Sequence, residues 1–423
     1  MRGRTLPCLF AALVAAAGCG AGPSGDDGPT RGPWRAERET IGDTLIVRTV
    51  SGSERGTGRL VEELRIGAVE GDDHENFGRI AALGVTPDGD ILVYDEQAVA
   101  LRRFDADGAY LGTIGREGSG PGEYRYVAGI AVLPDGRIAV HDFGNVRINL
   151  YEATGDFAGS WPARTTLAAV RPLPVDREGR LYLLDSRAVQ GSEQGTGTRE
   201  MILVRLGADG SPGDTLVVPY GDHRTPGLEV QTETASIGVL LPFAPARSWT
   251  VTAAGEVVAT TGKRYAVDVH RADGTVLRIE RAVRPVPVTP EERAAEEDRV
   301  TRSFRRHVPG WRWDGPAIPS TKPPVSWVHA SRDGALWVRI AQPGAPIPEG
   351  ERDRSARSFV REPVVFDLFR PDGRFIGQVS APGGLQLQPF PVFDEDRAWA
   401  VVTDVAGVPY VARYRVEWDD PVS

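Results

Sequence analysis

The chain has 423 residues, of which 41% are hydrophobic and 25% charged, and its formal net charge is −9. One ordinary domain of about 100–200 residues cannot account for this length, so a repeat array or a barrel is expected. The negative charge argues against nucleic acid as a partner, since such binding depends on Lys and Arg side chains that neutralise phosphates. Beyond the N-terminal region no segment has the roughly 18 apolar residues of a membrane span, which excludes a multi-span membrane protein.

Residues 1–18 have the features of an export signal. Arg2 and Arg4 form a charged start, the apolar run LPCLFAALVAAAG follows, and Cys19 comes next. The ending AAAGC resembles the lipobox of bacterial lipoproteins, although Ala16 stands where that family usually has Leu. The resemblance implies that Cys19 is lipidated and becomes the first residue of the mature protein.

The segment GAGPSGDDGPTRGP predicts a flexible tether, which we place at residues 19–41. We expect the protein to be lipid-anchored at the cell envelope, on the periplasmic side of the outer membrane. Ordinary cleavage near Ala17 is the alternative, and it would leave Cys19 as a free thiol. The other cysteine, Cys8, lies in the signal. The folded part therefore has no cysteine for a disulfide, a nucleophile or a metal site.

A repeat with a period of 47 residues follows the tether. Residues 77–115 align with residues 124–161, and the matched pairs are Pro87 with Pro134, Asp95 with Asp142, Phe104 with Tyr151, and Gly108 with Gly155. Each unit has short apolar runs and two turns of the Asp-Gly type, 19 residues apart. Asp-Gly between such runs predicts a two-residue hairpin, because both residues tolerate positive φ. Two hairpins joined by a link give four antiparallel strands, which is the blade of a β-propeller.

The paired turns recur along the chain and predict six blades. They lie at 88–89 and 107–108, 135–136 and 154–155, 178–179 and 209–210, 254–255 and 273–274, 333–334 and 372–373, and at 395–396 in a sixth unit of three strands. We therefore predict an all-β fold, a six-bladed β-propeller of four-stranded antiparallel blades over residues 42–418, with 419–423 as a tail. Strand 43–50 is expected to add the missing outer strand of the sixth blade and so close the ring. A seventh blade within 219–245 is disfavoured, because that stretch lacks the paired turns.

Residues 118–151 resemble the NHL-type six-bladed propellers. GSGPGEY is similar to the family's link between blades, and GIAVLPDGRIAVHD is similar to its two inner strands. Asp142, Asn145 and Arg147 match its Asp-x-x-Asn-x-Arg pattern. Over about 42–418 the chain also resembles the six-bladed propeller lipoproteins of bacteria.

The first blade departs from the polar pattern, since Ala98 and Ala100 replace the Asn and Arg. This departure favours a structural role of the motif over ligand binding. We expect Asp142 to accept hydrogen bonds from Arg147 and from turn amides, which would fix the hairpin.

Three alternate glycines in REGSGPGEY, residues 116–124, suggest a phosphate-binding loop at first sight. Such a loop requires a helix directly after it, and a Walker loop also requires Lys-Ser or Lys-Thr. Here EYRYVAGIAVL follows and predicts a strand, so we interpret the glycines as the link from blade one to blade two. If this stretch contacts a ligand, the expected contacts are Tyr124, Arg125 and Tyr126, near the axis.

The segment 285–324 is the least repetitive part of the chain and predicts an inserted surface helix at about 289–308. Thr289 suits the N-cap and Pro290 suits the first helical position. We expect this helix to form a partial lid over the central face of the propeller. The tryptophans after it either form a binding surface or attach the helix to the blades. The candidate ligand or partner contacts in this region are Trp311, Trp313, Lys322, Trp327 and His329.

The sequence predicts no catalytic or metal site. Its six histidines include no i,i+2 or i,i+4 pair, and no Gly-x-Ser-x-Gly occurs. The acidic clusters 105–108 and 394–397 coincide with turns of the repeat. Related propeller enzymes include lyases with zinc and calcium-dependent lactonases, but none of their ligand sets can be matched here.

We therefore expect a monomeric binding or scaffold module, without a cofactor, for a protein or glycan at the cell envelope. The alternative is a propeller enzyme of the lyase or lactonase kind with a metal at the axis. A third possibility is a structural component of an envelope complex with no small-molecule site.

Overall fold

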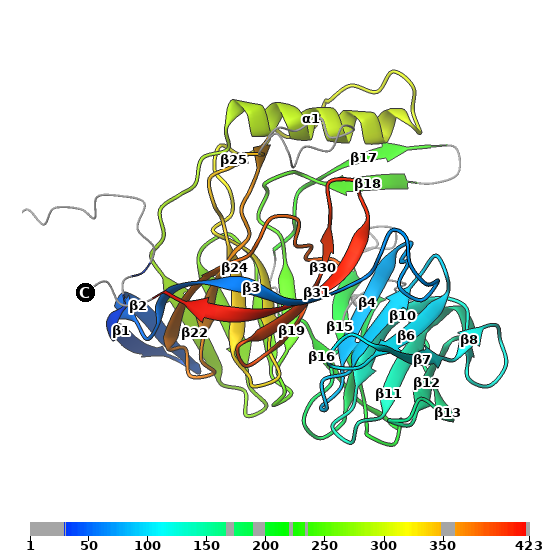
Figure 1. Cartoon of the computed structure of the whole chain (residues 1–423). Coiled ribbons are helices and arrows are strands. Elements are labelled where there is room, and N and C mark those ends of the chain that lie inside the picture. Colours follow the sequence, from blue (N-terminus) through cyan, green and yellow to red (C-terminus); the bar gives the residue numbers. More distant parts are fainter. Residues whose placement is uncertain are drawn as a thin grey trace, which may run out of the picture.

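Antiparallel β-sheets arranged around one axis make up most of the protein, as the computed structural model shows (Figure 1). The structure describes residue 29 and residues 31–165, 173–188, 199–219, 223–232, 236–347 and 360–419. The predicted signal at 1–18 and Cys19 lie outside these residues. Among the helices that the structure describes, none is long and apolar enough to cross a membrane.

The predicted blades are confirmed at the positions of the paired turns. Blade one contains β4 (Ile80–Val85), β5 (Ile91–Asp95), β6 (Ala100–Phe104) and β7 (Tyr110–Ile114). Blade two contains β10 (Val127–Val132), β11 (Ile138–Asp142), β12 (Arg147–Tyr151) and β13 (Phe157–Pro162), with a 3-10 turn at Phe143–Asn145. Blade three contains β14 (Leu181–Ala188), β15 (Arg199–Leu206) and β16 (Pro212–Val217), and a bridge between Val175 and Leu181 marks its inner segment.

The second half of the chain repeats the arrangement. Blade four contains β19 (Ser248–Val251), β20 (Val257–Thr260), β21 (Ala266–His270) and β22 (Val276–Arg281). Blade five contains β23 (Val325–Ala330), β24 (Leu336–Ile340), β27 (Val365–Phe369) and β28 (Phe375–Ser380). Blade six contains β29 (Val392–Asp394), β30 (Arg397–Thr403) and β31 (Pro409–Trp418). Two short pairs lie between blades or strands, β8 (Arg116–Glu117) with β9 (Glu123–Tyr124) and β25 (Ala345–Pro346) with β26 (Val360–Arg361).

The Asp-Gly turns join the strands as predicted, but in the first turn of blade two only the glycine has a positive φ, so it is not the expected two-residue turn. In the first turn of blade two, Gly136 has a φ of 87° and its amide donates to the Leu133 carbonyl at 2.9 Å. A residue with a Cβ is strained at that φ, so glycine is favoured there. The strands on either side are buried almost throughout, which places the apolar runs in the cores between blades.

The predicted closing strand is wrong. Residues 43–50 lie mainly in β2 (Thr44–Ser53), which pairs in parallel with β22 and extends blade four. The sixth blade is closed by β3 (Gly56–Ile66), antiparallel to β31, and β3 also pairs in parallel with β28 of blade five. The physical reason is burial, because Val47 of β2 packs into the core that blades four and five share. Blades five and six consequently form one continuous sheet.

The predicted tether at 19–41 is too long. Residues 32–41 form β1 (Gly32–Ile41), which pairs antiparallel with β2 along its length. Trp34 of β1 donates a hydrogen bond from Nε1 to Thr49 Oγ1 at 3.2 Å and packs against the same shared core. The fold therefore includes residues 32–41, which the prediction assigned to the tether.

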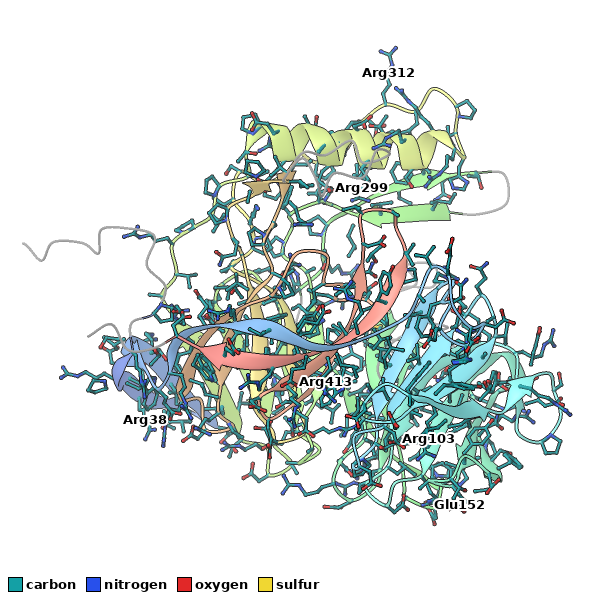
Figure 2. The ribbon with its side chains drawn as sticks, viewed as in Figure 1. Arg38, Arg103, Glu152, Arg299, Arg312 and Arg413 are labelled. Atoms are coloured by element: carbon teal, nitrogen blue, oxygen red, sulfur yellow. The ribbon has the colours of Figure 1, made fainter. Side chains whose placement is uncertain are left out.

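Arginines on third strands connect neighbouring blades. Arg413 of β31 donates to the Ala106 carbonyl in blade one at 2.6 Å, and Arg103 of β6 donates to the Ala153 carbonyl in blade two. Ala106 and Ala153 occupy the same place in the 47-residue repeat. Figure 2 labels both arginines on the propeller body. These contacts hold successive blades in a fixed orientation.

The predicted helix is confirmed as α1 (Pro290–Arg305), with Thr289 as its N-cap. Thr289 Oγ1 accepts from the Glu292 amide at 3.2 Å, and Glu292 Oε2 accepts from the Thr289 amide at 3.0 Å, which completes a capping box. The helix lies beside the hairpin β17 (Gly227–Gln231) and β18 (Ser236–Leu240), away from the blades (Figure 1). Val300 and Phe304 are fully buried there against Leu228 and Leu241.

Candidate functional site

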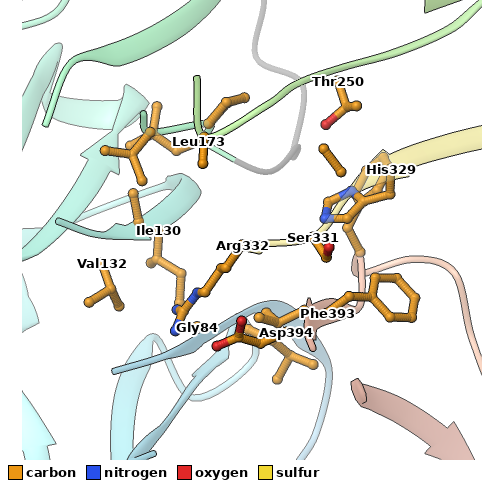
Figure 3. Close-up of a pocket in the computed structure, with 18 of the residues that line it drawn as sticks. Gly84, Ile130, Val132, Leu173, Thr250, His329, Ser331, Arg332, Phe393 and Asp394 are labelled. Carbon is orange, nitrogen blue, oxygen red and sulfur yellow. The ribbon is translucent and has the colours of Figure 1, made fainter. Parts of the chain in front are cut away.

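The inner segments of all six blades enclose a cavity on the propeller axis. Its volume is about 510 Å³, which lies within the range of small-molecule sites. The lining comes from β4, β10, β19, β23 and β29, and from the inner segment of blade three. Most of these residues lie in the C-terminal halves of the inner strands or in the turns that follow. Figure 3 shows this cavity with side chains converging on it from several strands.

Helix α1 does not cover this cavity, contrary to the expectation of a lid. The cavity is lined by residues 329–332, at the C-terminal end of β23. The inserted segment enters β23 at the other end of the strand, before Val325. The helix and the β17–β18 hairpin therefore lie at the opposite end of the inner strands.

One side of the cavity is apolar. The side chains there come from blades one to three, namely Ala81, Ala82, Leu83, Ile130, Val132, Leu133, Leu173 and Val175. Phe390 and Phe393 of blade six add aromatic rings to the lining. Such a wall favours apolar ligand surface, at roughly 25 cal/mol per Å² removed from water.

The charged side of the cavity is formed by Arg332 and Asp394. Arg332 follows β23, its guanidinium donates to the Val85 carbonyl, and its amide donates to the Phe393 carbonyl at 3.2 Å. Figure 3 shows the Arg332 side chain directed toward Gly84, with Asp394 nearby. Burial lowers the pKa of Arg332 and raises the pKa of Asp394, and in each case the other's charge opposes the shift. Arg332 is nevertheless exposed and Asp394 is half-buried, so solvent reaches both side chains from the cavity.

His329 is the one predicted contact whose side chain lines the cavity. Its ring stacks on Trp327 with a centroid distance of 5.3 Å and an interplanar angle of 4°. Burial lowers the pKa of His329 to about 4, so the imidazole is neutral at pH 7. Trp327 itself is largely buried behind His329, between Phe366, Phe390 and Phe393. It supports the cavity wall rather than lining it.

Tyr124, Arg125 and Tyr126 lie away from the cavity. Tyr124 is fully buried, and its hydroxyl donates to the Ile114 carbonyl and accepts from the Leu101 amide, both at 2.9 Å. Arg125 and Tyr126 precede β10, at the end opposite to its cavity residues. The structure therefore brings none of the three to the axial site.

The other predicted contacts belong to the inserted segment. Trp311 packs on Phe304 of α1 with a centroid distance of 4.7 Å, and Trp313 donates from Nε1 to the Pro316 carbonyl at 3.1 Å. Lys322 is buried, and its Nζ donates to Glu292 at 2.6 Å and to Glu362 at 2.9 Å. The two tryptophans therefore pack around the helix within the inserted segment rather than against the blades, and Lys322 links the helix to Glu362.

The repeat motif holds the glycine-rich link. Asp142 accepts from the amides of Arg125, Tyr126 and Asn145, whereas Arg147 Nε lies 3.7 Å from it. Arg147 instead donates to the carbonyls of Gly120 and Glu123, at 2.5 and 2.7 Å, and Asn145 donates to Gly118 at 2.9 Å. The link is thus fixed by side chains from the next hairpin.

In blade one, a different side chain holds the corresponding link between blades. Arg102 donates to the Asn76 carbonyl at 2.9 Å, and Asn149, one repeat later, donates to the Glu123 carbonyl at 2.9 Å. Asn76 and Glu123 are themselves one repeat apart. The motif residues therefore secure loops rather than face a ligand.

The sequence analysis did not identify Arg332 as a candidate site residue. It considered Asp394 only as part of an acidic turn. The signal was present in the first turn of each blade. One residue precedes the Asp-Gly pair, or the pair that replaces it, in each of these turns. It is Pro87 in blade one, Pro134 in blade two and Ala253 in blade four. In blades three and five it is an arginine, Arg177 and Arg332. All five residues line the cavity. Charged residues at this position could have been recognised only with the axial geometry in view.

Within the described part of the chain, no group of three or more His, Cys, Asp or Glu side chains is placed to hold a metal ion. The buried Asp176 on the cavity lining accepts from Arg180 at 2.6 Å and from Tyr182 at 2.8 Å. Its hydrogen-bonding capacity is therefore used within blade three.

A family model supports the fold over part of the chain. The DUF5128 family, described as a 6-bladed beta-propeller, matches residues 65–194. A member of the DUF4221 family from Bacteroides vulgatus is similar over 86% of this chain and 100% of its own, with 9% identity and a TM-score of 0.45. A candidate exported protein from Bacteroides fragilis covers 89% of this chain and 100% of its own, with 11% identity and a TM-score of 0.45.

Virginiamycin B lyase from Staphylococcus aureus is more distant, with 9% identity, a TM-score of 0.35, and coverage of 85% of this chain and 99% of its own. A search of curated proteins found no match. At such identities and TM-scores these likenesses carry no functional argument. The chain is a six-bladed β-propeller.

Proposed function

We propose that this protein is a binding module of the cell envelope and that its ligand is a small molecule held in the axial cavity. The observation that supports this proposal is the cavity itself, about 510 Å³ in volume and lined by the inner segments of all six blades. A rigid ring with a preformed, mostly apolar cavity and a few polar groups matches small-molecule sites in general. The apolar wall favours such a ligand over a glycan, whose hydroxyls would need many polar partners.

Filling the cavity tests this proposal. Val132 lines the cavity on the apolar side, so Val132→Trp is expected to block it. The probe is N-phenyl-1-naphthylamine, a neutral apolar dye that fluoresces when it leaves water. We expect saturable binding to the wild type and at least a tenfold weaker affinity for the variant, about 1.4 kcal/mol.

The control is Val405→Trp, the same substitution at an exposed turn of blade six. It should bind the dye as the wild type does. Val132→Phe is a smaller replacement that serves if the tryptophan variant fails to fold, as judged by circular dichroism. Dye binding that is unaffected by either change at Val132 would contradict a ligand site in the cavity.

The envelope location rests on the lipobox-like sequence before Cys19, and Cys19→Ala tests it. In a Gram-negative host we expect the wild type in the detergent phase of a Triton X-114 partition and the variant in the aqueous phase. The reason is that the diacyl anchor supplies the membrane affinity, because two or more chains hold firmly where one does not. A variant that stays in the membrane fraction would show that Cys19 is not the anchor.

A further inference from the structure

The cavity lining has two arginines, Arg177 and Arg332, and neither forms an ion pair with a described residue. Asp176 is paired with Arg180, so its negative charge is balanced within blade three. The remaining charged lining residues are Arg177, Arg332 and Asp394, two cations against one carboxylate. The cavity therefore offers two cations without a carboxylate partner, although the chain as a whole carries −9.

Arg332 has unused hydrogen-bonding capacity. One guanidinium nitrogen donates to the Val85 carbonyl, and among the described residues no partner accepts from the others. Arg332 and Asp394 influence one another's charge but do not form an ion pair. A guanidinium with free donors can bind an anion, because charge-assisted hydrogen bonds are about twice as strong as neutral ones.

Arg177 is a second cation on the cavity lining that could bind an anion. It occupies the same position of its turn as Arg332, and its backbone and Nε both donate to the Ala253 carbonyl, at 2.8 and 3.2 Å. Arg177 and Arg332 are both exposed, so solvent screens the charge of each. Arg332 is the residue expected to decide affinity, because its side chain extends toward Gly84 and the Val85 carbonyl of blade one, beside the apolar lining.

From the proposed binding function together with this charge pattern, we infer that the ligand is a small amphipathic anion. Its anionic group, a carboxylate or a phosphate, lies at Arg332, and its apolar body lies against the inner strands of blades one to three. This arrangement uses both sides of the cavity at once. A neutral apolar molecule would offer no acceptor to the remaining guanidinium donors of Arg332, and an alkylamine would add a second cation beside them.

The test is displacement of N-phenyl-1-naphthylamine by decanoate, decyl phosphate, decanol and decylamine at pH 7.5, each below its micelle concentration. In the wild type we expect the two anions to bind about tenfold or more tightly than decanol, with decylamine weakest. The stronger of the two anions identifies the head group. Arg332→Gln should remove the advantage of the anions and leave decanol unchanged, whereas Arg332→Lys should retain part of it.

Arg125→Gln is the matched control, because Arg125 is exposed at the opposite end of β10 and should not alter any of the four affinities. Equal binding of anions and decanol to the wild type, or an anion preference that survives in Arg332→Gln, would overturn the inference. The wild-type comparison keeps it testable if the Gln variant does not fold. If the wild type does not bind the dye at all, the proposed binding function itself is contradicted. Failure of the proposed function can thus be distinguished from failure of the inferred anion preference.

Discussion

Replacing Asp367 with alanine is expected to lower the free energy of unfolding by about 3–5 kcal/mol. Asp367 of blade five is completely buried. One of its oxygens accepts from the Tyr265 hydroxyl and from Arg281, both in blade four, and the other accepts from Gln378 at 3.0 Å. The alanine would leave a buried guanidinium and a buried hydroxyl without an acceptor, and a buried donor that lacks a partner bears its full desolvation penalty.

The electrostatics support the size of this effect. Burial raises the pKa of Tyr265 well above its usual value, and the Asp367 charge raises it further. Burial lowers the pKa of Arg281, but Asp367 outweighs this and the pKa of the guanidinium is raised. Arg281 also lies over the Phe375 ring at 4.6 Å, which holds the largely buried guanidinium in the blade interface.

Urea denaturation of Asp367→Ala and Asp367→Asn measures the loss. The asparagine keeps the side chain's shape and removes only its charge, so it should lose less stability than the alanine. Asp268→Ala is the control, because Asp268 pairs with Arg278 on neighbouring strands of blade four but is partly exposed. Its loss should not exceed about 1 kcal/mol. An alanine variant of Asp367 whose stability stays within about 1 kcal/mol of the wild type would show that the network does not join the blades.

Lys322→Ala is expected to have the second largest effect, again about 3–5 kcal/mol. The buried ammonium is held by Glu292 of α1, by Glu362 and by the Gln342 carbonyl at 2.8 Å. Without it, the two carboxylates face each other with only Arg339, 3.8 Å from Glu362, as a remaining cation among the described residues. Glu292 is itself part of the capping box, so the start of the helix should loosen together with its attachment to blade five.

Limited proteolysis and hydrogen exchange distinguish local from global loss. We expect faster exchange across α1 in Lys322→Ala before the blades unfold, because the helix packs on the β17–β18 hairpin rather than on the ring. Lys263→Ala is the natural control, since Lys263 is exposed and is the chain's only other lysine. Unchanged exchange in α1 would mean that the salt bridges do not secure it.

The propeller could be predicted because its signals are local. Asp135-Gly136 and its counterparts recur with fixed spacing, and the turns they form depend on the φ values that those residues allow. Helix α1 was predictable for the same reason, because Thr289 and Pro290 cap it without help from distant residues. The buried apolar runs also determine which residues of neighbouring strands pair within each blade.

The closing strand could not be predicted in this way. Both β2 and β3 are strands of about the right length near the N-terminus, and each has buried apolar residues such as Val47 and Leu60. Their partners, β22 and β31, lie far away along the chain, at residues 276–281 and 409–418. The choice between them depends on which inter-blade core each strand fills, and a single sequence does not contain that information.

The number of blades, their turns, the helix and the structural role of the repeat motif follow from local signals along the chain. The site, in contrast, depends on how the blades are arranged in space. Arg332, His329 and Asp394 come from two blades, and Val132 comes from a third. Nothing in their sequence spacing brings them together. They converge because the ring places the inner strand of every blade on one axis, so residues that are unrelated along the chain share one cavity.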